Sequence, residues 1–202
     1  MDRIALIVEY DGTNYCGWQV QKNGETIEGV LNRELSALFK EDIRVVGASR
    51  TDSGVHALGN AAVFDTNARM PGEKMSYALN SRLPEDIAVQ SSEEVAVSYH
   101  PRKCNSVKTY EYRILNRQFP DPTRRLSSTF CHWPLDAGRM QAAADYLLGE
   151  HDFASFCSAG SQAEDTVRKL YEAAVTRTGD LVTIRLSGNG FLYNMVRIIA
   201  GT

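Results

Sequence analysis

Short strand-like runs separated by turn residues are the feature that most constrains the fold of this chain. Each run is rich in β-branched or other apolar residues and is bounded by turn residues or polar loops. The clearest ones span residues 3–10, 43–46, 60–64, 87–89 and 107–115. Two more, 167–176 and 181–186, flank Thr178-Gly179-Asp180 and predict a hairpin. Strands joined in hairpins, with helices set between them, indicate an α+β protein with a largely antiparallel sheet.

Four segments carry helix signals. Thr26 can cap a helix whose apolar residues fall on one face, and Asp136 can cap another that ends near Gly149. Pro71 suits the first position of a short helix, which Pro84 closes. A fourth, apolar helix is predicted over 191–200, after a glycine-rich turn. Helices and strands therefore alternate along both halves of the chain.

The composition is that of a soluble globular protein. Of 202 residues, 43% are hydrophobic and 23% are charged, and no apolar run is long enough to cross a bilayer. The first residues lead directly into a strand-like run and lack the organisation of a signal peptide. The four cysteines are scattered without a CxxC pair, which predicts neither a zinc site nor a disulfide framework. We therefore expect a cytoplasmic protein with no metal and no membrane partner.

The distribution of charge favours a nucleic-acid partner more than the net charge of −3 does. Residues 100–125 hold seven basic residues and only two acidic ones. The basic ones are Arg102, Lys103, Lys108, Arg113, Arg117, Arg124 and Arg125. Two interpretations stay open, a solvated strand face and an RNA-binding surface. Tyr110 and Tyr112 lie within the stretch and favour RNA, because aromatic side chains stack on bases.

The segment 47–59 concentrates reactive side chains directly after an apolar run. Arg50 and Asp52 are two residues apart, so they project to the same face wherever the backbone is extended. An arginine beside an aspartate lowers the carboxyl pKa, which favours an ionised nucleophile. Two alternatives are a turn aspartate that bonds its own backbone and half of an aspartic-protease site, since Asp52-Ser53-Gly54 fits that signature. The protease needs two carboxylates that share a proton, which Arg50 would oppose.

Two later segments also invite a functional interpretation. Arg197 lies in an otherwise apolar helical stretch that follows Gly188-Asn189-Gly190. It either reaches solvent or is buried and paired with an essential carboxylate, because an unpaired buried charge is costly. The segment 151–158 contains His151 and Cys157, but their spacing fits no ligand template, and we expect them to be structural.

Four motifs resemble the tRNA pseudouridine synthase A (TruA) family, in the family's order and spread over the whole chain. They are Arg50-Thr51-Asp52-Ser53-Gly54-Val55-His56-Ala57, Lys108-Thr109-Tyr110-Glu111-Tyr112, Gly149-Glu150-His151-Asp152-Phe153 and Gly190-Phe191-Leu192-Tyr193-Asn194-Met195-Val196-Arg197. The resemblance implies two ferredoxin-like or RRM-like halves, residues 1–98 with the catalytic aspartate and residues 99–202. These halves would form a largely antiparallel central sheet with helices packed on it and a catalytic cleft between them.

The resemblance also implies a reaction, the isomerisation of uridine to pseudouridine at positions 38 to 40 of the tRNA anticodon stem-loop, without a cofactor. Asp52 matches the family's nucleophile, Tyr110 the tyrosine that packs on the target base, and Arg197 the arginine that pairs with the aspartate. Arg50 matches an arginine associated with flipping the target nucleotide. Arg102, Lys103 and Lys108 are expected to contact RNA. A homodimer that binds one tRNA across both subunits is expected.

The chain departs from the family pattern at three places. Ser49 and Ser53 stand where the family commonly has glycine and alanine. Family members also continue for several tens of residues beyond the segment that matches Gly201-Thr202. The alternative to an active synthase is therefore a tRNA-binding module that lacks catalysis. The sequence leaves open whether Asp52 attacks C1′ or removes the C2′ proton.

Overall fold

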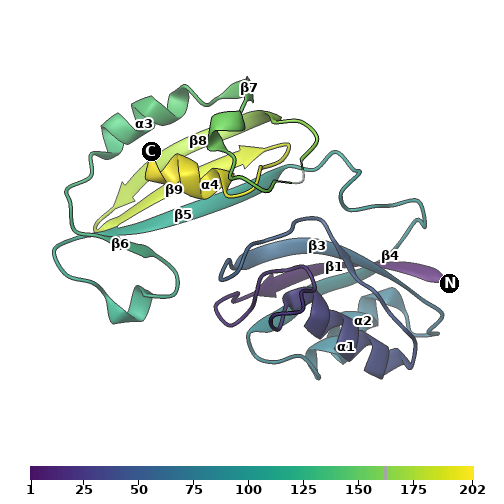
Figure 1. Ribbon diagram of the computed structural model, residues 1–202. Helices are drawn as coiled ribbons and strands as arrows, with labels where there is room; N and C mark the ends of the chain where they lie inside the picture. The colour runs from purple at the N-terminus through teal and green to yellow at the C-terminus, as the bar shows by residue number, and fades with distance from the viewer. Residues whose placement is uncertain (162) are drawn as a thin grey trace. The chain divides into compact units, whose positions relative to one another are not determined.

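The computed structural model describes residues 1–161 and 163–202 and divides them into two compact units (Figure 1). The units are Met1–Cys104 and Asn105–Thr202. Each contains helices and one mainly antiparallel sheet, which confirms the predicted α+β class. The domain assignment 1–98 and 99–202 stays a prediction. No helix in the described ranges is long and apolar enough to span a membrane.

The first unit packs two helices against a four-stranded antiparallel sheet. The strands are β1 (Asp2–Tyr10), β2 (Val46–Gly47), β3 (Ala57–Thr66) and β4 (Ile87–Val95), and the helices are α1 (Ile27–Phe39) and α2 (Gly72–Asn80). The strand order is β2-β3-β1-β4. Alternate residues of β1, such as Leu6 and Val8, face the helices and are buried, as the period of two requires. Thr26 caps α1 as predicted, because its side chain accepts a hydrogen bond from the Gly29 amide.

The strand predicted over 43–46 is wrong for most of its length. Ile43 and Val45 are buried as expected, but only Val46–Gly47 pairs with β3. Side chains of α1 take the place of strand partners, since Ser36 Oγ accepts from the Ile43 amide at 3.0 Å and Asn32 Oδ1 accepts from the Val45 amide at 2.7 Å. Burial of the apolar side chains therefore did not require a sheet ladder.

The second unit packs its helices against a five-stranded sheet of order β6-β5-β9-β8-β7. The strands are β5 (Lys108–Asn116), β6 (Thr129–Cys131), β7 (Gly149–Asp152), β8 (Val167–Thr178) and β9 (Leu181–Gly188). The helices are α3 (Ala137–Asp145) and α4 (Met195–Gly201), with short 3₁₀ turns at Pro122–Arg124 and Ala154–Phe156. Only β5 and β6 pair in parallel. The predicted hairpin is confirmed, with Gly179 at φ 59° in the loop between β8 and β9.

Both predicted helices of this unit differ from the structure at one end. Asp136 caps α3 as expected, but the helix ends at Asp145, and Gly149 begins β7 with φ 96°. The fourth helix begins at Met195 rather than residue 191, because Leu192 and Asn194 form a turn. In this turn the Met195 amide donates to the Leu192 carbonyl and Asn194 has φ 59°. Apolar periodicity alone did not separate this turn from the helix.

Candidate active site

Asp52 lies on the connection between β2 and β3, and the first residues of this connection are anchored to β3. The Ala48 amide donates to the Ala61 carbonyl at 2.7 Å. The buried side chain of Asn60 then bonds both backbone groups of Ser49, accepting from its amide and donating to its carbonyl, each at 3.1 Å. The side-chain amide of Asn60 thus takes the place of a strand partner and continues the pairing beyond Gly47. This pairing holds the chain in position just before Arg50.

Thr51 anchors the middle of the connection to the interior of the unit. Its hydroxyl lies 2.7 Å from the phenol oxygen of Tyr10, and its carbonyl accepts from the Trp18 amide at 3.0 Å. Thr51 and Tyr10 are buried, and Trp18 is fully enclosed. Neither Tyr10 nor Trp18 was singled out from the sequence as part of the site. The one signal in the sequence was that Tyr10 ends an apolar strand, since a buried tyrosine hydroxyl needs a hydrogen-bond partner.

A glycine is required at position 17, where the backbone of the segment before α1 meets the backbone of Thr51. Gly17 has φ 85°, and a Cβ there would lie 2.5 Å from the Thr51 carbonyl oxygen. No side chain can be placed so close, so this approach depends on glycine. The Ser53 hydroxyl and the Gly54 amide both donate to the Tyr15 carbonyl, at 3.2 and 3.3 Å. The segment before α1 therefore supports the connection on both sides of Asp52.

Asp52 itself is half-buried, between the anchored Thr51 and a tight turn. Its carbonyl accepts from the Val55 amide at 3.1 Å, and Gly54 adopts φ 77° in this turn. The backbone polar groups around Asp52 are thus occupied by structural bonds, while its side chain retains access to solvent. Such an arrangement presents a carboxylate on a fixed support, which suits a nucleophile or a base.

Arg102 approaches this connection from the far end of the first unit. Its Nε donates to the Gly47 carbonyl at 2.8 Å, across 55 positions of sequence. Partial burial of the guanidinium and the positive charge of Arg50 both lower the pKa of Arg102. The two arginines are therefore close enough to repel each other, and a bound anion would relieve that repulsion. Both residues are exposed.

His56 closes the connection beside an acidic groove. Its Nδ1 lies 2.9 Å from a carboxylate oxygen of Asp11 and 3.2 Å from the Gly12 amide nitrogen. Hydrogen bonds from Thr13 lower the pKa of Asp11, and the His56 charge adds to this effect. The groove, of about 440 Å³, is lined by Glu9, Tyr10, Asp11, His56, Ala57, Leu58, Glu85, Asp86, Ala88 and Gln90. Its carboxylates make it a poor surface for phosphates.

Three of the predicted site residues, Tyr110, Lys108 and Arg197, belong to the second unit. Tyr110 lies on β5, half-buried, with its ring edge against Phe191, 4.9 Å between centroids. Lys108 begins the same strand. Arg197 lies on α4 and is exposed, and its pairing with an essential carboxylate stays a prediction. The structure thus groups Asp52, Arg50 and Arg102 in one unit and Tyr110, Lys108 and Arg197 in the other.

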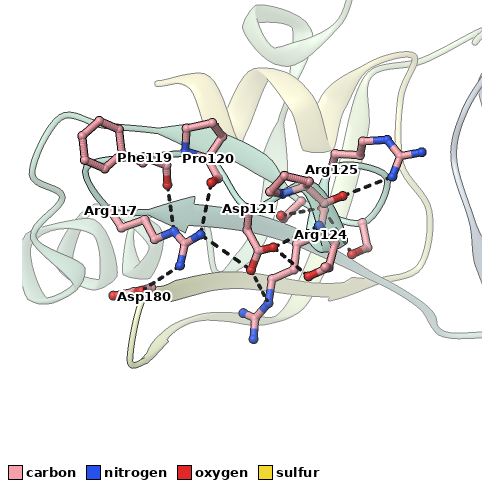
Figure 2. A network of polar contacts seen from close by, with 11 residues as sticks. Arg117, Phe119, Pro120, Asp121, Arg124, Arg125 and Asp180 are labelled. Carbon is pink, nitrogen blue, oxygen red and sulfur yellow. Dashed lines mark hydrogen bonds and ion pairs between the residues drawn. The ribbon is translucent and has the colours of Figure 1, made fainter.

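The basic stretch is divided between the two units. Arg102 and Lys103 close the first unit, whereas the other five basic residues belong to the second. Arg113 pairs with Glu111 at 2.8 Å across the strand face, and Arg117 and Arg124 approach Asp121 (Figure 2). Several of these cations are therefore partly neutralised by their own neighbours.

Local contacts hold the segment 151–158, and the structural role expected of His151 and Cys157 stays a prediction. Phe153 is buried, and Asp152 accepts from the Ala154 amide and from the Thr166 hydroxyl, which lowers the pKa of the Asp152 carboxyl. Within residues 1–161 and 163–202, no group of three or more histidine, cysteine or acidic side chains is arranged to hold a metal ion.

Comparison with known proteins identifies the family. A family model described as tRNA pseudouridine synthase matches residues 6–102 and 143–202. Proteins named tRNA pseudouridine synthase A align with the entire chain and are covered over 83% of their own length. Those from Thermoanaerobacter sp. (strain X514), Acetivibrio thermocellus and Ruminiclostridium cellulolyticum are 46%, 47% and 48% identical, respectively. On this evidence the chain belongs to the tRNA pseudouridine synthase family of isomerases.

Proposed function

We propose that this protein isomerises uridine to pseudouridine in the anticodon stem-loop of tRNA, at positions 38 to 40, with Asp52 as the nucleophile. Family membership supports the reaction class and the tRNA substrate. The motif from Arg50 to Ala57, within the region matched by the family model, supports the assignment of the nucleophile.

The observation that carries the proposal is the support given to Asp52. Its neighbour Thr51 is held by Tyr10 and Trp18, and the turn after it is held by the Tyr15 carbonyl. A reaction at one carbon atom of a bound nucleotide requires such fixed placement, since small displacements of a catalytic group lower the rate strongly. The half-buried carboxylate of Asp52 is the group that these contacts place.

The reaction breaks the N1–C1′ glycosidic bond and forms a C5–C1′ bond in its place. An ionised Asp52 either attacks C1′ and forms an ester that is later displaced, or takes the C2′ proton to give a glycal. In both routes the bond electrons leave with the uracil, which rotates before C5 joins C1′. In the glycal route, C2′ takes back its proton from Asp52 as the C5–C1′ bond forms. The C5 proton then departs to solvent, and N1 takes up one proton in exchange. No external oxidant, reductant or metal is needed for this balance.

Other side chains are assigned roles on the same nucleotide. Tyr110 would stack on the uracil, and its phenol could accept the C5 proton. Arg197 would pair with Asp52 and keep it ionised without supplying a proton. Arg50 would hold the nucleotide after it leaves its stack. These roles rest on the motif matches and require that the three residues act with Asp52 on one uridine.

Phosphate contacts are assigned to Arg102, Lys103 and Lys108. The mutual repulsion of Arg50 and Arg102 supports the first, because the negative charge of an RNA phosphate between the two guanidinium groups would reduce that repulsion. A homodimer and a cytoplasmic location are also proposed, supported by the family resemblance and by the tRNA substrate. Sedimentation with and without tRNA tests the first of these.

Release of tritium from tRNA that carries [5-³H]uridine tests the proposed nucleophile. Asp52→Asn should abolish release while tRNA binding stays near the parental level, because the amide keeps the shape but lacks the charge. Asp42→Asn is the matched control, since Asp42 is an exposed aspartate of the same unit. Release by Asp52→Asn at the parental rate would refute the assignment of the nucleophile.

A further inference from the structure

An exposed groove in the second unit combines aromatic rings with arginines. It lies between the end of β5 and the segment that follows β6, and its volume is about 460 Å³. We call it the β5–β6 groove. It is lined by Asn116, Arg117, Gln118, Phe130, His132 and Pro134. This volume falls in the range of about 300 to 1,000 Å³ that is usual for small-ligand sites.

Two of the lining residues, Phe130 and His132, carry aromatic rings, and the adjacent ring of Trp133 lies next to that of His132. Phe130 and His132 lie nearly parallel, 6.5 Å between centroids, and His132 lies 4.5 Å from Trp133. Phe130 is 40% exposed and Trp133 is 69% exposed. A planar partner that stacks on these rings would bury the area that they still expose to water, which is a source of binding energy.

Arg117 lines the same groove as Phe130 and His132, and Figure 2 shows its polar contacts together with those of Arg124 and Arg125 in the connection between β5 and β6. Arg117 Nε donates to the Phe119 carbonyl at 2.7 Å, and the guanidinium also approaches Asp121 at 3.7 Å and Asp180 at 3.8 Å. Its orientation is therefore fixed before any ligand binds. Arg125 is tied to the Pro122 carbonyl at 3.1 Å in the same way. The segment 117–134 carries three arginines and one aspartate, a net charge of +2 with histidine neutral.

A single-stranded nucleic acid fits such a groove, because its bases can stack on the exposed rings and its phosphates can pair with the oriented arginines. We propose that the β5–β6 groove binds unpaired nucleotides of the RNA substrate, in addition to the target uridine. The identity of the ligand as RNA rests on the proposed function, whereas the location of the binding site rests on the residues of the groove. A second copy of the chain fits less well, because a two-fold symmetric contact here would bring the same arginines against each other.

The two tryptophans of the chain allow a direct test. Trp18 is fully buried, whereas Trp133 is 69% exposed, so quenching of tryptophan fluorescence by RNA would report Trp133. Single-stranded oligouridylate should quench the parent protein, and Trp133→Phe should remove the quenching. Trp133→Ala should weaken binding of the same oligonucleotide, followed by fluorescence anisotropy of a labelled end, by about fivefold or more. Tyr146→Ala is the matched control, since Tyr146 is an exposed ring of the same unit at 84%.

Salt dependence gives a second variant with an independent readout. Arg124→Gln should lower the slope of log Kd against log salt concentration by about one unit, as expected for one lost phosphate contact. Parental binding and slope in both Trp133→Ala and Arg124→Gln would overturn the proposal. So would a change in sedimentation from larger to smaller species caused by Trp133→Ala, which would assign the groove to a second copy.

The outcome does not depend on the catalytic assignment, because oligouridylate binding is measured without turnover. Failure of the proposed function would appear as tritium release by Asp52→Asn, with binding at the groove unaffected. Failure of the groove proposal would appear as unchanged oligouridylate binding in Trp133→Ala, with Asp52→Asn still inactive.

Discussion

The hydrogen bond between Thr51 and Tyr10 should determine how firmly Asp52 is held. Thr51→Val keeps the shape of the side chain and removes the hydroxyl that lies 2.7 Å from the Tyr10 phenol. Both groups are buried, so the lost bond is not replaced by water. The Asn60 amide lies 3.5 Å from the same phenol, which leaves Tyr10 a polar neighbour. We therefore expect a loss of about 1 to 2 kcal/mol of unfolding free energy, in the lower part of the range for buried hydrogen bonds.

Urea unfolding of the parent and four variants measures this effect. Thr51→Ser retains the hydroxyl and should be closer to the parent than Thr51→Val is. Tyr10→Phe removes the same bond from the other side, so the double variant should lose less than the sum of the two single losses. In single-turnover assays at saturating tRNA, Thr51→Val should be slower than Thr51→Ser, with similar tRNA affinity. Additive losses in the double variant, or equal rates for the two Thr51 variants, would refute the reasoning.

Two further predictions concern charge. Arg3 donates two hydrogen bonds of 2.7 Å to the Asp65 carboxylate and lowers the pKa of that carboxyl. The stabilisation from this pair is complete above the unfolded-state pKa of about 3.9, and it is lost as pH falls through the lower folded-state pKa. Asp65→Asn should therefore lower stability at pH 7 more than at pH 2.5 in urea unfolding, and an equal loss at both pH values would contradict this. Arg102→Gln should weaken tRNA binding and lower its salt slope by about one unit, because Arg102 lies near Arg50, whereas the exposed Arg44→Gln should not. Unchanged affinity and slope in Arg102→Gln would remove Arg102 from the RNA surface.

Two helix caps and one hairpin were predicted correctly, because each of them depends only on residues close together in the sequence. Thr26 and Asp136 cap helices because a cap needs only a side-chain oxygen and the amides of the next turn. The hairpin around Gly179 likewise follows from a short loop between two apolar strands. The strand expected over 43–46 failed because Ser36 and Asn32, on a helix, satisfied its amides instead.

The sequence singled out Asp52 as a candidate, but it did not indicate the contacts that support this residue. Asp52 stands out in the sequence because a compact run of reactive residues surrounds it. The contacts of Thr51 with Tyr10 and of Arg102 with Gly47 join residues 41 and 55 positions apart. Contacts at that separation arise from the packing of the whole unit, for which no periodicity in one sequence gives a signal. Asn60 of β3, for example, can bond the backbone of Ser49 only when the sheet is assembled.

The close approach of Gly17 to the Thr51 carbonyl has a consequence for transplanting this site. The segment that carries Asp52 owes its conformation to the chain between Tyr10 and Trp18, which bonds or touches it along its length. Moving residues 48–56 alone into another scaffold would leave the Thr51 carbonyl and hydroxyl without these partners, and the aspartate without a defined direction. The smallest portable unit is therefore two segments, 10–18 and 48–60, together with a sheet that holds their ends at the same spacing.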